Sequence, residues 1–190
     1  GEPELRAVTD LFERAMQVGG AFDRYGIGVQ ARGTVSDDLV AETTDVDRFE
    51  AELAAYYGMS HVTAVASGTA AIHASLMALN LEPGTEVITS TLTDPGVPAA
   101  ILSSLCVPVF ADHDYETALV TADSIAAQIS PNTGAVIVTH LMGLVCDMAP
   151  IMQLAQDRGI RVIGDSSQAH GSTYHGSRSA PLGHVGEIGR

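Results

Sequence analysis

Short apolar runs rich in β-branched residues alternate with stretches of helical spacing over most of the chain after residue 58. The runs predict strands, and the stretches between them predict helices. Because the runs are apolar on both faces, they are typical of a parallel sheet that is covered by helices on each side, which is an α/β fold. The predicted strands span residues 61–66, 86–89, 107–111, 135–139 and 160–164.

Two further helices are predicted before this alternation begins. Apolar positions within residues 3–18 recur at helical spacing and are followed by two glycines. Residues 19–44 are rich in Gly, Asp and Thr and show no periodicity, so they predict an extended connector. Thr44 and Asp47 have the spacing of a capping box, and the helix that they begin is expected to end at Gly58.

The pattern divides the chain into residues 1–44, an N-terminal helix and connector, and residues 45–190, which carry the strands and helices in alternation. A chain of 190 residues fits one domain or a large piece of one, and such a chain can bury about 70% of its unfolded surface. The apolar share of 46% and the charged share of 17% are typical of a globular protein.

Charge and cysteine content indicate which binding partners and which cellular compartment to expect. Nine arginines against 23 acidic residues give a net charge of −14, which disfavours nucleic acid and anionic membrane surfaces as partners. No apolar run approaches the roughly 18 residues of a membrane span. Cys106 and Cys146 lie in apolar segments without the spacing of metal ligands, so we expect buried thiols in a reducing, cytoplasmic compartment.

The turn formed by Ser67, Gly68 and Thr69 is a candidate anion site. It follows the first predicted strand and begins a helix, where free backbone N–H groups and the positive end of the helix dipole meet two hydroxyl groups. This combination suits a phosphate group. A strand-to-helix turn with a Ser or Thr cap explains the same pattern without any ligand.

A second candidate site follows the last predicted strand. Asp165 stands at the carboxyl edge of that strand, where open α/β sheets bind ligands, and Gln168 comes three residues later. A carboxylate at this place can keep the nitrogen of a pyridine ring protonated, and an amide can bond the hydroxyl edge of the ring. The structural alternative for Asp165 is an N-cap of a following helix.

Five motifs follow one another along the chain: Ser-Gly-Thr-Ala-Ala at 67–71, Pro-Gly-x-Glu-Val-Ile at 83–88, Pro-Val-Phe-x-Asp at 108–112, His-Leu-x-Gly-x-x-x-Asp-Met at 140–148 and Asp-x-x-Gln-Ala-His-Gly at 165–171. In this order, the chain from about Phe49 onward resembles the DegT/DnrJ/EryC1/StrS family of pyridoxal-phosphate-dependent sugar aminotransferases. The resemblance implies an aspartate-aminotransferase-like large domain of fold type I, with three α/β/α layers, a mostly parallel sheet and pyridoxal 5′-phosphate as cofactor.

The resemblance also implies roles for individual residues. The turn at 67–69, with Gly68 and Thr69 foremost, would hold the cofactor phosphate. Asp165 would pair with the pyridinium nitrogen, and Gln168 would contact the ring oxygen. His140 is interpreted as a core histidine bonded to backbone.

Two features of the chain depart from the family pattern. Where similar proteins place an aromatic residue that stacks on the pyridine ring, this chain has Asp94. Either the register of the comparison slips there, or Asp94 has another task, such as a hydrogen bond to the ring or the substrate. The second departure is that the 190 residues contain no lysine, whereas the family's Schiff-base lysine would follow residues 182–186 within about a dozen residues.

The resemblance therefore implies that the catalytic lysine, the last strands of the sheet and the smaller C-terminal domain belong to other sequence. They would come from the C-terminal part of the same protein or from a second polypeptide, in a homodimer or heterodimer. The activity implied is transfer of an amino group from an amino acid to a keto-sugar or keto-cyclitol. Two alternatives remain open: a lysine-free, non-catalytic scaffold subunit, and a sugar dehydratase that uses the same cofactor.

Two rival interpretations fit the residues less well. A dinucleotide-binding domain requires a G-x-G-x-x-G turn after the first strand, and the turn here is Ser-Gly-Thr. The histidines at positions 170, 175 and 184 have no helix-face or zinc-ribbon spacing, so no metal site is predicted.

Overall fold

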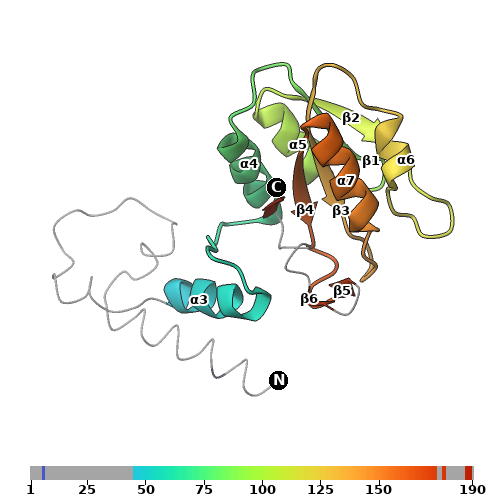
Figure 1. Ribbon diagram of the computed structural model, residues 1–190. Coiled ribbons are helices and arrows are strands. Elements are labelled where there is room, and N and C mark those ends of the chain that lie inside the picture. Colours follow the sequence, from blue (N-terminus) through green and yellow to red (C-terminus); the bar gives the residue numbers. More distant parts are fainter. Residues whose placement is uncertain (1–5, 7–44, 175–176, 179–186, 190) are drawn as a thin grey trace. The chain divides into compact units, whose positions relative to one another are not determined.

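The computed structural model describes residues 6, 45–174, 177–178 and 187–189 (Figure 1). Residues 45–190 form one compact unit of the chain. The helix predicted over residues 3–18 lies outside the described residues except for Arg6, as do the connector and Thr44. Within the described residues, no helix combines the length and the apolar character needed to cross a membrane.

The centre of the unit is a five-stranded sheet with the strand order β2-β1-β3-β4-β7. The first four of these strands run parallel, and β7 pairs antiparallel to β4. Parallel neighbours require crossover connections, which the helices between the strands provide. The strands are β1 (Glu86–Ser90), β2 (Val107–Ala111), β3 (Thr133–Thr139), β4 (Arg161–Asp165) and β7 (Glu187–Gly189).

Helices cover both faces of the sheet. The helices of the unit are α3 (Asp45–Tyr57), α4 (Gly68–Leu79), α5 (Gly96–Ser103), α6 (Ala122–Ala126) and α7 (Met148–Arg158). Figure 1 shows α4 and α5 on one side of the strands and α6 and α7 on the other. The three-layer α/β/α architecture is therefore confirmed.

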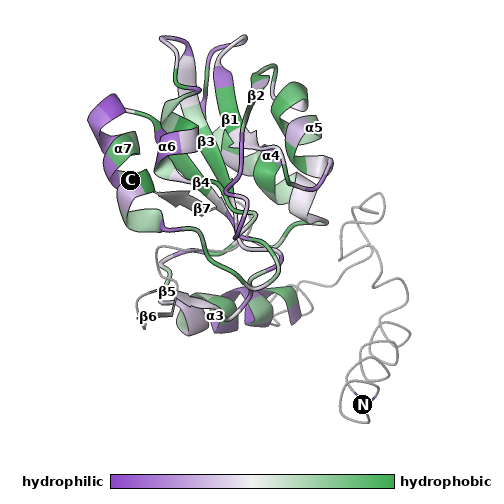
Figure 2. Cartoon of the chain, turned by 90° about the vertical axis from the view of Figure 1, so that its right-hand side faces the viewer, coloured by the Kyte–Doolittle hydropathy of each residue, from purple (hydrophilic) through white to green (hydrophobic). Residues whose placement is uncertain are grey.

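Successive residues of each strand pack into two separate cores, because their side chains point to opposite faces of the sheet. Val87, Ile137 and Ile163 pack with α4 and α5. Their neighbours in sequence, including Ile88 and Val138, pack with α6 and α7. Figure 2 shows hydrophobic residues concentrated on the strands between the helix layers. Both faces of these strands are buried, which explains why the sequence shows continuous apolar runs rather than alternation.

Local signals explain where the helices begin and end. Ser67 is the N-cap of α4. Asn80 is the C-cap of this helix and adopts a left-handed conformation with φ 50°. Gly159 ends α7 with φ 68°, a conformation that glycine adopts without steric cost. The predicted end of α3 at Gly58 agrees with the structure, in which Tyr57 is the last helical residue.

The predicted first strand, residues 61–66, is wrong, because these residues form no strand in the structure. A strand needs a neighbour to bond its backbone, and within the described residues none pairs with this segment. Instead, the backbone N–H of Ala64 donates to the Glu50 carboxylate on α3 at 2.7 Å. The short hairpin of β5 (Thr173–Tyr174) and β6 (Ser177–Arg178), and the antiparallel strand β7, were not predicted from the sequence.

Candidate cofactor site at the carboxyl edge of the sheet

Asp165 is the last residue of β4 and lies at the carboxyl edge of the sheet, opposite Thr139 of β3. Its side chain is buried, with 3% of the residue exposed. One carboxylate oxygen, Oδ1, accepts hydrogen bonds from the Ser167 backbone N–H at 3.1 Å and the Ser167 hydroxyl at 2.7 Å. The described residues provide no such partner for Oδ2, so this oxygen is available to a ligand.

The alternative role of Asp165 as a helix N-cap does not hold, because turns rather than a helix follow β4. The bonds to Ser167 instead form a tight turn that fixes the orientation of the carboxylate. A buried acid held in this way at a sheet edge can face a cationic ligand group in a region of low dielectric.

The turn at 67–69 combines a helix cap with free amides. The Ser67 hydroxyl accepts from the Ala70 N–H at 3.1 Å, and the Ser67 carbonyl accepts from the Ala71 N–H at 3.0 Å. Ser67 is therefore a helix cap, as the structural alternative proposed. Within the described residues, no partner bonds the amides of Gly68 and Thr69, which remain at the positive end of the α4 dipole.

Gly96, at the start of α5, brings this turn into contact with Asp94. A Cβ atom at Gly96 would overlap Thr69 Oγ1 and would lie 2.8 Å from Asp94 Oδ1. Both oxygens therefore border the position that a Cβ atom would occupy, so this close approach requires a glycine.

A pair of hydroxyl groups connects this region to β3. Thr93 Oγ1 and Thr139 Oγ1 are 3.1 Å apart. Thr139 is the β3 partner of Asp165 in the sheet, and Thr93 directly precedes Asp94. The turn at 67–69 and Asp165 are thus connected along one edge of the sheet, through residues that touch one another.

Gln168 is exposed and is held in place by the loop after β3. Its carbonyl oxygen accepts from the Gly143 N–H at 2.8 Å, and its side-chain Oε1 lies 3.4 Å from the Met142 N–H. Since Oε1 is turned toward the backbone, Nε2 is the atom that can donate to a ligand.

Asp94 adopts a local role that the sequence did not reveal. Its Oδ1 accepts from the Gly96 N–H at 2.7 Å, and its carbonyl oxygen accepts from the Val97 N–H at 3.0 Å. These bonds form a turn directly before α5, whose N-cap is Pro95, and this turn sets the position of Asp94.

His140 lies in the core, close to Asp165. It is fully buried, and its Nδ1 accepts from the Cys146 N–H at 3.2 Å, which confirms a core histidine bonded to backbone. The acceptor role of Nδ1 places the ring hydrogen of the neutral imidazole on Nε2, which has no partner within the described residues. Burial lowers the pKa of His140 from 6.5 to about 4, although nearby Asp165 acts in the opposite direction.

The buried imidazole predicts acid sensitivity of the fold. Above pH 6.5 the imidazole is neutral in both states, but as the pH falls toward 4 only the unfolded chain takes up the proton, so stability is lost. We expect the wild type to lose about 2 kcal/mol more than His140→Asn between about pH 7.5 and about pH 5. Asparagine can still accept from the Cys146 N–H. Denaturant unfolding at both pH values measures the difference, and parallel losses in the two proteins would refute it.

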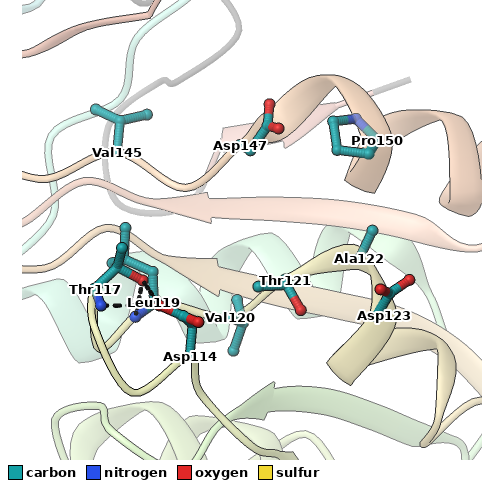
Figure 3. Close-up of a pocket in the computed structure, with 10 residues that line it drawn as sticks. All are labelled: Asp114, Thr117, Leu119, Val120, Thr121, Ala122, Asp123, Val145, Asp147 and Pro150. Carbon is teal, nitrogen blue, oxygen red and sulfur yellow. Dashed lines mark hydrogen bonds between the residues drawn. The ribbon is translucent and has the colours of Figure 1, made fainter.

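Two cavities lie elsewhere on the unit. One, of about 410 Å³, lies between residues 114–123 and the start of α7, where Asp114 accepts hydrogen bonds from Thr117 (Figure 3). The other, of about 520 Å³, lies between α3 and the loop at 170–171. Neither is lined by the residues of the candidate cofactor site.

No group of three or more His, Cys, Asp or Glu side chains is arranged to hold a metal ion in the described part of the chain. His175 and His184 lie outside the described residues. Cys106 and Cys146 are buried free thiols, as predicted. Burial raises the pKa of Cys146 to about 12, so it is a protonated core residue at neutral pH.

Comparison with known proteins identifies the family. The profile of the DegT/DnrJ/EryC1/StrS aminotransferase family matches residues 30–189. The chain belongs to this family. The match confirms the resemblance that the five motifs indicated, and it covers both the turn at 67–69 and Asp165.

Individual members of the DegT/DnrJ/EryC1/StrS family share sequence and fold with the chain. GDP-perosamine synthase from Caulobacter vibrioides is 38% identical over 135 residues, covering 71% of this chain and 36% of that protein. DesV from S. venezuelae, solved with a ketimine intermediate, is 29% identical with a TM-score of 0.74, covering 93% of this chain and 43% of that one. NtdA from Bacillus subtilis, solved with the cofactor PMP, is 35% identical with a TM-score of 0.66, covering 70% and 31%.

These structural relatives establish fold type I for this member of the DegT/DnrJ/EryC1/StrS family. The chain spans about a third of the length of GDP-perosamine synthase. The fold and the family are therefore assigned to this chain.

Proposed function

We propose that this chain provides the cofactor-binding part of a pyridoxal-phosphate-dependent aminotransferase. The reaction would transfer an amino group from an amino acid, such as glutamate or glutamine, to a keto-sugar or keto-cyclitol. The observation that carries the proposal is the continuous edge from Asp165 through Thr139 and Thr93 to Thr69. This edge provides partners for the two ends of one small ligand.

The residues at this edge fit the chemistry of pyridoxal phosphate. The free amides of Gly68 and Thr69, with the Thr69 hydroxyl, offer donors for a phosphate at the positive end of a helix. The free Oδ2 of Asp165 offers an anionic acceptor for a pyridinium N–H, and the Gln168 Nε2 offers a donor for the ring oxygen. When bound, the cofactor supplies an electron sink for the carbon from which the substrate proton is removed.

Asp165 has the central task in this proposal. Its buried carboxylate would hold a proton on the ring nitrogen, because an adjacent negative charge favours the protonated pyridine. Ser167 keeps the carboxylate in one orientation, so no reorganisation is needed when a ligand arrives. The turn at 67–69 would fix the opposite end of the ligand and thereby set the position of the ring.

The amine that binds the cofactor must come from outside these 190 residues, since they contain no lysine. We infer a partner segment, either from the C-terminal part of the same protein or from a second polypeptide, in a homodimer or heterodimer. A keto-sugar acceptor is supported by relatives such as GDP-perosamine synthase, whose name refers to a nucleotide-linked amino sugar. A cytoplasmic location is part of the proposal.

The test uses the chain in the assembly in which it is isolated, mixed with pyridoxal phosphate. We expect a yellow imine that borohydride discharges, and mass spectrometry should locate the reduced adduct on a lysine outside residues 1–190. Addition of glutamate should convert the imine to the pyridoxamine form. An assembly that contains such a lysine and forms no imine would contradict the proposal.

The absence of lysine also favours a second candidate function, a non-catalytic partner that retains the fold and serves as a scaffold for a complete homologue. This candidate predicts that imine formation and activity in the assembly do not change when Asp165 is replaced. A sugar dehydratase on the same cofactor, with histidine at the lysine position, would bind the cofactor without a reducible lysine adduct.

A further inference from the structure

The departure at Asp94 places a negative charge beside the turn at 67–69. A Cβ atom at Gly96 would touch both Thr69 Oγ1 and Asp94 Oδ1, so these two oxygens are close neighbours. The hydrogen bond from the Gly96 N–H, at 2.7 Å, holds the carboxylate in this position. The bond therefore positions the carboxylate beside the turn, although Asp94 itself is exposed to solvent.

No cation offsets this charge in the part of the chain that the structure describes. The ion pairs there join Arg48 to Asp45 and His113 to Asp112, and neither pair involves Asp94 or the turn. A phosphate monoester on the Gly68 and Thr69 amides would carry up to two negative charges next to a third. Asp94 is exposed, so solvent screens the repulsion. Two unit charges about 4 Å apart still repel by about 1 kcal/mol in water, and added salt weakens this further.

We propose that Asp94 is a specificity-determining residue that weakens the binding of dianionic phosphate tails at the turn and leaves the ring face without a stacking partner. This inference rests on the proposed function of the site. Its consequence is that the phosphate contacts at the turn add less to the affinity for the cofactor than they would without this charge, and that the cofactor exchanges more readily with free cofactor in solution.

The test compares wild type and Asp94→Asn, each in the assembly in which the chain is isolated, by equilibrium dialysis against pyridoxamine 5′-phosphate and against pyridoxamine. Neither probe has an aldehyde, so binding requires no lysine. Asparagine keeps an oxygen that can accept from the Gly96 N–H. We expect Asp94→Asn to bind pyridoxamine 5′-phosphate about tenfold more tightly, with the gain shrinking at high salt, and to bind pyridoxamine as the wild type does.

Two further variants separate charge from other effects. Asp123→Asn removes an exposed charge of the same sign on α6 and should leave both affinities unchanged. Asp94→Phe adds a stacking surface as well as removing the charge, so it should tighten the binding of both probes.

Three results would overturn the inference. Equal affinities of wild type and Asp94→Asn for pyridoxamine 5′-phosphate would show that the charge has no effect. An equal gain for pyridoxamine would show that the effect does not come from the phosphate. No binding of either probe by any variant would overturn the proposed function together with this inference.

Discussion

Replacing Asp165 by alanine is expected to reduce amino transfer by about 10²-fold or more in the assembly that contains the Schiff-base lysine. Without the carboxylate, the ring nitrogen loses the group that favours its protonation, and the ring becomes a poorer electron sink. The fold should remain, because among the described residues the side chain bonds only its neighbour Ser167, while the backbone carbonyl keeps its bond from the His140 N–H. Steady-state turnover with saturating amino donor measures the effect.

Asp165→Asn is the matched control for packing. Asparagine has nearly the same volume and can accept from Ser167, but it carries no charge, so activity should fall similarly while the unfolding transition stays close to that of the wild type. Turnover retained in Asp165→Asn and lost in Asp165→Ala would assign a packing role to this residue. Turnover retained in both would end its assignment to the cofactor.

Replacing Gly96 by alanine is expected to weaken the binding of pyridoxamine 5′-phosphate by at least tenfold. The added methyl group would overlap Thr69 Oγ1 and would lie 2.8 Å from Asp94 Oδ1, so the Thr69 side chain, or the turn that carries it, must move. Overpacking of this kind costs roughly 1–3 kcal/mol. Here the side chain that must move is one of the proposed phosphate ligands. Equilibrium dialysis with the phosphate-bearing probe measures the loss.

Gly134→Ala controls for destabilisation by overpacking alone. A Cβ atom at Gly134 would lie 2.5 Å from Thr85 Cγ2, near the start of β3 and away from the carboxyl edge of the sheet. It should lower the free energy of unfolding without lowering the affinity of the folded protein for the probe. If Gly96→Ala binds the probe as tightly as Gly134→Ala does, the turn at 67–69 is not the phosphate site.

The parallel sheet was predictable because its strands are buried on both faces and therefore appear as short apolar runs separated by helical spacing. Residues 107–111 were predicted with the bounds that the structure shows, and β1, β3 and β4 differ by one or two residues. The turn at 67–69 and Asp165 were identifiable because each follows an apolar run directly. The family resemblance implied that the turn and Asp165 bind the same cofactor. In the structure, the two are connected along the carboxyl edge of the sheet.

The remaining features depend on contacts that a local pattern does not encode. Residues 61–66 have a strand-like composition, yet the backbone of Ala64 bonds Glu50 on α3 instead of a neighbouring strand. The turn made by Asp94 depends on the amide two residues later, and its effect depends on Thr69, which is distant in sequence. The buried Nε2 of His140 is evident only once β3 and β4 are placed side by side.

The central claim is that one ligand joins the turn at 67–69 to Asp165. A crystal structure of the assembly with pyridoxamine 5′-phosphate tests it most directly. We expect the phosphate on the Gly68 and Thr69 amides and the ring nitrogen within hydrogen-bonding distance of Asp165 Oδ2. A ligand bound in another cavity, or one whose ring nitrogen faces away from Asp165, would contradict it.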